Sequence, residues 1–414
     1  MAILPANWKA RLRRTVVYRP LLHYKAYRGL RRYLSWRDQA YNVAPGGFGS
    51  PGYLTKSFAL VKQRFKTQIM PKNDVKHVRL LVITLPNISA IWCEQELARS
   101  FDAHFLSVTR HLLAFRSGDT DPLSSSIGVF PEDRFSTPGE EINLPVEWKR
   151  KLQQDILELA ADLHRKTPID LCFVNGRRDA FTGETFRRLK EIGIPVAFLW
   201  LDEKHAFLGD SDLAASCTVW LTNSREALRW YLARNIPVYY FPQAIDPEVY
   251  RPQGLKKDIP VSFMGAAYGY RFEFIRRLEK AGIPIQCFGR GWDNPVRDQI
   301  EIYNRTLINI GIGTTGLSKE VTCLKGRDFE VPATGSLYLT TYDPEFAEMF
   351  HIGREALCYR NEFDCIEQIY YYLERKDEAE AIGLKGRERC LREHTWTKRM
   401  MGLLKWLKIL AQDL

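Results

Sequence analysis

The chain has 414 residues, of which 45% are hydrophobic and 26% are charged, and its formal net charge at pH 7 is +11. This length exceeds what one ordinary hydrophobic core organises, so the sequence predicts two domains, and the composition excludes a disordered or fibrous chain. The apolar runs fall far short of the ~20 residues that cross a bilayer, so we expect no transmembrane helix.

Two further features favour a cytoplasmic protein. The N-terminus shows neither an apolar signal segment nor a small-residue cleavage site. The eight cysteines form no Cys-x-x-Cys pair, so metal and redox motifs are unsupported. We therefore expect reduced cysteines that pack in the core.

The basic charge is concentrated in an N-terminal arm. Residues 1–72 hold 15 Lys and Arg side chains and one acid, Asp38, giving +14, whereas the other 342 residues carry 45 basic and 48 acidic side chains, giving −3. Between Trp8 and Trp36 the cations alternate with tyrosines. Such a stretch suits an anionic membrane surface, nucleic-acid phosphates or an acidic protein, and it also suits an extension packed against the body.

Beyond residue 72, strand and helix patterns alternate. The predicted strands are continuous apolar runs, which are typical of sheets covered on both faces. They span residues 78–85, 170–175, 195–201, 218–222, 238–241, 261–264, 283–288, 307–312 and 336–341. The predicted helices span residues 148–165, 183–192, 224–234 and 270–280.

One helix-to-strand junction occurs three times, as Gly193-Ile194-Pro195, Asn235-Ile236-Pro237 and Gly282-Ile283-Pro284. Gly or Asn takes the left-handed position that ends a helix, and Pro then prevents the helix from continuing. Because the junction occurs in both halves, the sequence predicts an α/β chain of two Rossmann-like, doubly wound domains facing a cleft. Four prolines between residues 242 and 260 indicate the linker.

Two stretches of the second half carry candidate chemistry. In the first, Gly265 ends a strand and Arg271 opens a helix, an arrangement in which backbone N–H groups and a guanidinium can hold an anion. In the second, Lys325 and Arg327 could hold a diphosphate, and Glu330 could accept hydrogen bonds from a ribose diol. Each pattern also occurs in ordinary turns and helix starts.

Taken together, these stretches resemble the nucleotide-sugar site of GT-B glycosyltransferases, and most closely the CgeB-like branch of the group 1 glycosyl transferases. The matching segments are Phe263-Met264-Gly265 through Arg271, Phe288-Gly289-Arg290-Gly291-Trp292, Lys325-x-Arg327-x-Phe329-Glu330-x-Pro332-Ala333-x-Gly335, Tyr342-x-Pro344-Glu345 and Thr395-Trp396-x-x-Arg399. The N-terminal half matches less sharply, and the arm is not covered.

The chain departs from the family pattern at one position. Many retaining GT-B enzymes carry two glutamates eight positions apart, and Glu330 matches the second of them. Eight positions earlier stands Thr322, with Glu320 the nearest acid. This difference weakens the expectation of a retaining mechanism without reversing it.

The resemblance implies a hexosyltransferase that moves a sugar from a nucleoside-diphosphate donor to an acceptor, with no cofactor and no metal. Gly265, Arg271, Lys325, Arg327 and Glu330 would bind the donor, and Arg327 would also act in catalysis by meeting the charge on the leaving diphosphate. The pair Asp210-x-Asp212 is better explained as the cap of a short helix at 212–216 than as a metal ligand.

The acceptor side is expected in the N-terminal domain. Asp202 and His205 follow an apolar strand, and His205 is the better candidate for a catalytic base because histidine titrates near neutral pH. Asn175 and Arg177 follow another strand and could line the acceptor cleft. All four also fit ordinary surface loops.

The full prediction is a cytoplasmic glycosyltransferase that acts on a glycan or lipid-linked acceptor and touches the inner membrane face through residues 1–40. A catalytically degenerate module that only binds nucleotide sugars is the alternative, and nucleic acid is an unfavoured partner. The predicted divisions are an arm at 1–72, an acceptor domain at 73–242, a linker at 243–259, a nucleotide-sugar domain at 260–395 and a C-terminal helix at 396–414 that packs on the N-terminal domain.

Overall fold

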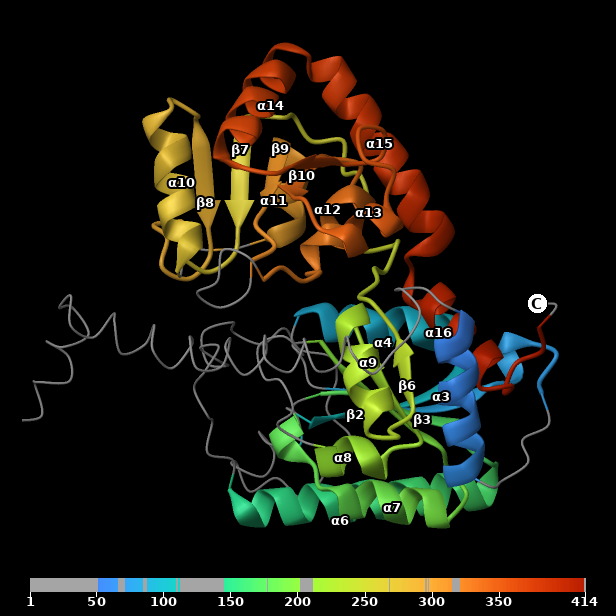
Figure 1. Cartoon of the computed structure of the whole chain (residues 1–414). Coiled ribbons are helices and arrows are strands. Elements are labelled where there is room, and N and C mark those ends of the chain that lie inside the picture. The colour runs from blue at the N-terminus through green and yellow to red at the C-terminus, as the bar shows by residue number, and fades with distance from the viewer. Residues whose placement is uncertain are drawn as a thin grey trace, which may run out of the picture. The chain divides into compact units, whose positions relative to one another are not determined.

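The computed structural model describes residues 51–65, 71–84, 88–108, 111, 145–176, 178–201, 211–267, 269–294, 296, 298–314 and 321–412. The chain divides into two compact units (Figure 1). The described residues of the N-terminal unit fall within 51–201, 211–249 and 393–412, and those of the C-terminal unit fall within 250–392. Each unit is built on its own parallel sheet.

Within the described residues, the N-terminal unit contains a six-stranded parallel sheet in the order β2-β1-β3-β4-β5-β6. The strands are β1 (Arg79–Thr84), β2 (Asp102–Ser107), β3 (Leu171–Asn175), β4 (Val196–Trp200), β5 (Val219–Thr222) and β6 (Val238–Tyr240). The order of the strands reverses between β1 and β3, which is the doubly wound arrangement.

The helices of the N-terminal unit cover both faces of this sheet. They are α3 (Pro51–Arg64), η1 (Val75–His77), α4 (Ile88–Ser100), α6 (Val146–Lys166), η3 (Arg178–Ala180), α7 (Gly183–Glu191), α8 (Ser211–Ser216), α9 (Arg225–Ala233) and α16 (Trp396–Trp406). Side chains of α3, α4 and α16 form one apolar core with alternate residues of the strands. On the other face, Phe186 of α7 packs on Phe198 of β4.

The end of the segment assigned to the arm is part of this unit. Ser57 of α3 is buried, and its Oγ donates to Val238 O at 2.7 Å and accepts from Val238 N at 2.8 Å. Arg64 donates to the carbonyl oxygens of Ala215 and Asn235, each at 2.7 Å. Helix α3 is therefore bound to the edge strand β6 through Ser57 and to α8 and the turn after α9 through Arg64. Residues 1–50, which carry most of the predicted arm, lie outside the described residues.

The C-terminal unit contains a five-stranded parallel sheet in the order β11-β10-β9-β7-β8. Its strands are β7 (Ile259–Met264), β8 (Ile285–Phe288), β9 (Thr306–Gly311), β10 (Leu337–Thr341) and β11 (Leu357–Tyr359). Its helices are α10 (Tyr270–Lys280), α11 (Gln299–Arg305), α12 (Arg327–Ala333), α13 (Pro344–Met349), α14 (Glu362–Glu374) and α15 (Lys376–Glu393). Residues of α10, α14 and α15 share an apolar core with the strands.

The predicted fold class, two Rossmann-like α/β domains, is confirmed. The three junctions behave as expected, because Gly193, Asn235 and Gly282 have φ of +93°, +54° and +81°. Among the described residues, β2 and β11 are strands that the sequence patterns missed. The first is an edge strand that mixes polar and apolar residues, and the second is only three residues long.

The cysteines are reduced and mostly lie in the core. All eight cysteines are free, and all but Cys358 are buried. Within the described residues, no helix is long and apolar enough to cross a membrane. The same residues contain no group of three or more His, Cys, Asp and Glu side chains arranged to hold a metal ion.

Helix α16 is held in the N-terminal unit by a buried carboxylate at its first turn. The Oε2 atom of Glu96, on α4, accepts from Trp396 N at 2.9 Å, and Oε1 accepts from Thr397 N at 3.0 Å. Thr395 caps the same turn through a bond from Lys398 N. Burial raises the pKa of Glu96, and the hydrogen bonds from α16 oppose that rise.

We expect Glu96→Gln to lower the free energy of unfolding of the N-terminal unit by about 1–3 kcal/mol, because an amide offers one acceptor where the carboxylate offers two. Urea denaturation measures the effect. Glu158→Gln is the matched control, since Glu158 is exposed on α6 and accepts a side-chain hydrogen bond from Gln154 of the same helix. Equal losses in the two variants would show that the cap does not hold α16.

Candidate active site

The strand order of the C-terminal unit marks one edge of its sheet as the place for a ligand. Strand β7 lies between β8 and β9, so the chain leaves β7 toward one side and later returns to the other. Ligands of open α/β sheets bind at the carboxyl ends of the strands beside such a reversal. The residues that follow these ends are Gly265 after β7, Gly289 after β8 and Ile312 after β9.

The loops after β7 and β8 are tied to each other. Gly265 N donates to Phe288 O at 2.9 Å, and Ala267 N donates to Arg290 O at 2.8 Å. The Nε1 atom of Trp292 donates to Gly265 O at 2.8 Å. The N–H groups of residues 265 and 267, which the sequence suggested for an anion, are thus bonded to the neighbouring loop.

Gly289 has to be a glycine for this arrangement. Its φ is +113°, and a Cβ at this position would lie 2.9 Å from Gly265 O. Both the backbone conformation and the close approach exclude a side chain. Gly289, the first glycine of the Gly-Arg-Gly-Trp run, therefore allows the loops after β7 and β8 to approach each other closely.

Two arginines converge on Gly265. Arg271, in the first turn of α10, is only 5% exposed. A Cβ built on Gly265 would lie 3.2 Å from Nη1 of Arg327 and 3.5 Å from Nη1 of Arg271. Two guanidinium groups so close to one backbone position create a strongly positive spot at the carboxyl edge, which suits a multiply charged anion.

Arg327 also joins two strands. Its Nη1 donates to Met264 O at 3.2 Å, at the end of β7, and its Nη2 donates to Ile312 O at 2.7 Å, directly after β9. Its Cζ lies 5.4 Å from the centroid of the Phe263 ring. The guanidinium therefore bridges the two strands that flank the reversal, a role that the sequence did not indicate.

Glu330 lies one turn further along α12 and is 6% exposed. Its Oε2 accepts from Nε2 of Gln299 at 2.7 Å and from the hydroxyl of Tyr303 at 3.3 Å. Both donors belong to α11, and the sequence reasoning missed them. Their spacing of four residues, which places them on one face of a helix, is the only signal that could have suggested them.

Lys325 precedes this helix and is half-buried. Its N–H donates to Oδ2 of Asp328 at 2.6 Å, and the hydroxyl of Tyr338 donates to Oδ1 of the same carboxylate at 2.5 Å. Burial raises the pKa of Asp328, while the nearby Arg327 opposes this. Asp328 thus fixes the turn that carries Lys325.

Thr322 stands where the glycosyltransferases that the sequence resembles carry the first of two glutamates. The Oγ1 atom of Thr322 donates to Oδ2 of Asp343, which caps α13 through a 2.7 Å bond from Glu345 N. Glu320 lies outside the described residues. Thr322 therefore links two loops of the C-terminal unit.

Of the acceptor-side candidates, the structure describes only Asn175. It is 9% exposed, ends β3 and pairs in register with Thr84 at the end of β1. It therefore lies where the strand order of the N-terminal sheet reverses. Arg177, Asp202 and His205 lie outside the described residues.

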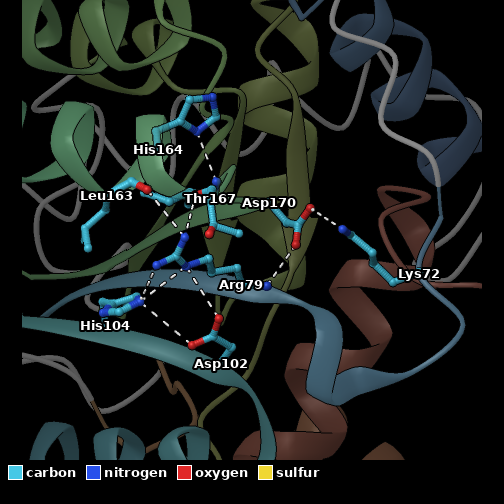
Figure 2. A network of polar contacts seen from close by, with 9 residues as sticks. Lys72, Arg79, Asp102, His104, Leu163, His164, Thr167 and Asp170 are labelled. Carbon is cyan, nitrogen blue, oxygen red and sulfur yellow. Dashed lines mark hydrogen bonds and ion pairs between the residues drawn. The ribbon is translucent and has the colours of Figure 1, made fainter.

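A polar network lies at the amino ends of the strands of the N-terminal sheet, at the end away from Asn175 (Figure 2). Arg79, the first residue of β1, donates from Nη1 to Thr167 O at 2.6 Å and from Nη2 to Nε2 of His104 at 3.0 Å. Its N–H donates to Asp170, whose pKa is raised by burial and whose other oxygen lies 3.7 Å from Nζ of Lys72.

This network holds the amino ends of the strands together. Arg79 pairs in register with Asp102, the first residue of β2. The Nδ1 atom of His164 accepts from Ile169 N at 3.0 Å, and burial lowers the pKa of this histidine. Because ligands bind at the other edge of such sheets, we regard the network as structural.

Comparisons with known proteins agree with this geometry. Residues 271–405 match the model of a family described as glycosyl transferase-like. A comparison with curated proteins found no match.

The structure is similar to that of Anabaena Alr3699/HepE in complex with UDP and glucose, with a TM-score of 0.53, 10% identity, and coverage of 81% of this chain and 100% of that chain. The complex of the same protein with UDP-glucose gives a TM-score of 0.51 at 10% identity, with the same coverage. A glycosyltransferase from Rickettsia africae gives a TM-score of 0.49 at 12% identity, covering 81% of this chain and 99% of that chain. The two Anabaena comparisons establish the two-domain Rossmann-like fold.

We expect Arg327→Lys to lower the free energy of unfolding of the C-terminal unit by about 1–3 kcal/mol. A lysine ammonium cannot reach both Met264 O and Ile312 O with the spread of a guanidinium, which leaves one carbonyl without its charged donor. Thermal and urea unfolding measure the loss. Arg276→Lys is the control, because Arg276 is exposed on α10 and stacks on Phe272. Equal stabilities would contradict the bridge.

Proposed function

We propose that this protein transfers a sugar, most simply a hexose, from a nucleoside-diphosphate donor to an acceptor. The observation that carries the proposal is the convergence of Arg271 and Arg327 on Gly265 at the reversal of the C-terminal sheet. The match of residues 271–405 to the glycosyl transferase-like family supports it. The similar Anabaena protein was crystallised with UDP and glucose and with UDP-glucose, which favours a nucleotide-sugar donor here.

The proposed mechanism uses the charge of these side chains. As the bond between the sugar and the diphosphate breaks, negative charge grows on the diphosphate, and fixed cations lower the energy of that state. Arg271, Arg327 and Lys325 supply the cations, and Glu330 accepts from the ribose hydroxyls. We propose that these side chains, without a cofactor or a metal, meet the charge of the leaving group.

The finer assignments are part of the same proposal. We place the chain in the CgeB-like branch of the group 1 glycosyl transferases and expect retention of the anomeric configuration. Asp202, His205, Asn175 and Arg177 remain the candidates for the acceptor side, with His205 as the base. A glycan or lipid-linked intermediate is the proposed acceptor.

The contrasting candidate is a module that binds nucleotide sugars without turnover. Thr322, in place of the first family glutamate and bonded to Asp343, is the observation that favours it. Incubation with UDP-, GDP-, ADP- and CDP-sugars separates the two. Release of nucleoside diphosphate supports the enzyme, whereas tight binding of an intact sugar nucleotide supports the module.

We expect Glu330→Gln to weaken binding of the nucleotide-sugar donor by about 1–3 kcal/mol, because a charge-assisted acceptor is lost. Isothermal titration with the donor found in the panel measures the change. Glu273→Gln, on the exposed side of α10, changes the charge equally and serves as the control. Unchanged affinity in folded Glu330→Gln would remove Glu330 from the site.

We also propose that the protein is cytoplasmic and binds the inner membrane face through residues 1–40. The described surface supports an anionic partner, because α3 and residues 396–412 together carry seven Lys and Arg side chains and no acid. The Nζ atoms of Lys62 and Lys408 lie 5.0 and 5.4 Å from the ring centroid of Phe58. Cations around an aromatic ring suit a lipid headgroup region.

Flotation with vesicles tests this attachment. We expect binding to phosphatidylglycerol-containing vesicles, no binding to phosphatidylcholine vesicles, and a loss of binding as salt rises, since each cation contributes about 1 kcal/mol that salt screens. Arg13→Glu with Arg14→Glu should reduce binding strongly. Lys376→Glu with Lys385→Glu, on exposed sites of α15, makes the same charge change and should not. Equal recovery on both vesicles would contradict the proposal.

A further inference from the structure

Helix α11 presents two donors to one carboxylate oxygen. Asp298 fixes the start of the helix, since its Oδ1 accepts from Ile300 N at 2.9 Å and Glu301 N at 3.0 Å. One turn apart on the helix, the Gln299 amide and the Tyr303 hydroxyl both donate to Oε2 of Glu330. They are also close to each other, with Nε2 of Gln299 at 3.2 Å from the Tyr303 hydroxyl. The three side chains form a closed triangle.

Tyr303 is a buried hydrogen-bond donor. Its side chain is 3% exposed, and its backbone oxygen accepts from Ser336 Oγ at 2.8 Å and from Asn309 Nδ2 at 3.3 Å. Burial and the neighbouring Glu330 raise the pKa of Tyr303 well above its ordinary value, which favours the protonated hydroxyl that donates to Glu330. The backbone of Tyr303 is therefore fixed by Asn309 of β9 and by Ser336, the residue before β10, while its hydroxyl donates to Glu330.

The second oxygen of the Glu330 carboxylate, Oε1, is confined by the turn at Gly326. Glu330 N donates to Gly326 O at 3.0 Å, and a Cβ built on Gly326 would lie 2.5 Å from Oε1 of Glu330. The space occupied by Oε1 thus depends on a glycine at residue 326. Oε2 is fixed by α11, and Oε1 lies directly against the turn that begins α12.

We propose that Gln299 and Tyr303 are positioning residues that keep the buried Glu330 carboxylate ionised and in one orientation, so that it can accept hydrogen bonds from the hydroxyls of the donor nucleotide. Burial alone disfavours a carboxylate, and two donors on one oxygen compensate for the water it has lost. The claim that Glu330 binds the nucleotide rests on the proposed function. The claim that Gln299 and Tyr303 position the Glu330 carboxylate does not.

The first measurement needs no ligand. In full-length protein labelled with 13C at the glutamate carboxyl, the Glu330 signal is identified by its absence in Glu330→Gln and followed by NMR as pH changes. We expect Gln299→Leu and Tyr303→Phe each to move its titration midpoint to higher pH. The controls Gln286→Leu and Tyr342→Phe, at exposed positions of the same unit, should leave it unchanged. Unmoved midpoints in folded Gln299→Leu and Tyr303→Phe would overturn the proposal.

The second measurement tests the nucleotide. At a pH where Glu330 is ionised in every variant, UDP and GDP are titrated by calorimetry, and we expect a 3- to 10-fold higher Kd in Tyr303→Phe. Gln299→Glu places a second carboxylate against Oε2, so the pH below which binding weakens should be higher than in the parent. Shifted midpoints with parental affinity would overturn the role in binding. Shifted midpoints in a protein that binds neither nucleotide would sustain the positioning role and count against the proposed function.

Discussion

The guanidinium of Arg327 is the contact on which the C-terminal unit depends. Strands β7 and β9 lie side by side, but the chain leaves their carboxyl ends in different directions, which leaves backbone carbonyls near the reversal to be satisfied. Arg327 donates to one carbonyl from each side and lies over the ring of Phe263. Because Arg327 is also the first residue of α12, the same contact sets where Glu330 lies. Strand order, helix position and the candidate site are thus linked through one side chain.

The charged residues around Arg327 have different tasks, although they are close in sequence. Asp328 is buried and accepts hydrogen bonds from Lys325 N and from the Tyr338 hydroxyl, so it stabilises the turn before α12. Glu330 accepts hydrogen bonds from Gln299 and Tyr303 of α11. Arg271 reaches the same spot from α10. A buried charge is costly unless partners replace its water, and both carboxylates have such partners within the unit. The two carboxylates are thus bound by neutral donors, while the two guanidinium groups converge on Gly265.

The sequence predicts much of the fold and only part of the site, for physical reasons. The junctions at Gly193, Asn235 and Gly282 follow from local backbone chemistry, so the repeated βα pattern could be read directly. Strand β2 was missed because an edge strand is solvated on one side and loses its apolar pattern. Arg327 was identified as a site residue, but its bridge between Met264 and Ile312 depends on strand order. Gln299 and Tyr303 were missed because their partner is distant in sequence.

At several places in this chain an arginine joins two segments by donating to their backbone carbonyl oxygens. The net positive charge of the chain therefore does not by itself indicate an anionic ligand. Arg79 holds the amino edge of the N-terminal sheet through Thr167 O, and Arg64 joins the end of α8 to the turn after α9 through Ala215 O and Asn235 O. Arg387 donates to the backbone oxygens of Tyr250 and Ala333. A planar fork with several donors can join two carbonyls, which an ammonium group cannot do at this spread. Arg64, Arg79 and Arg387 therefore stabilise the fold, and an external anion has to be sought where guanidinium groups converge at a carboxyl edge, as they do at Gly265.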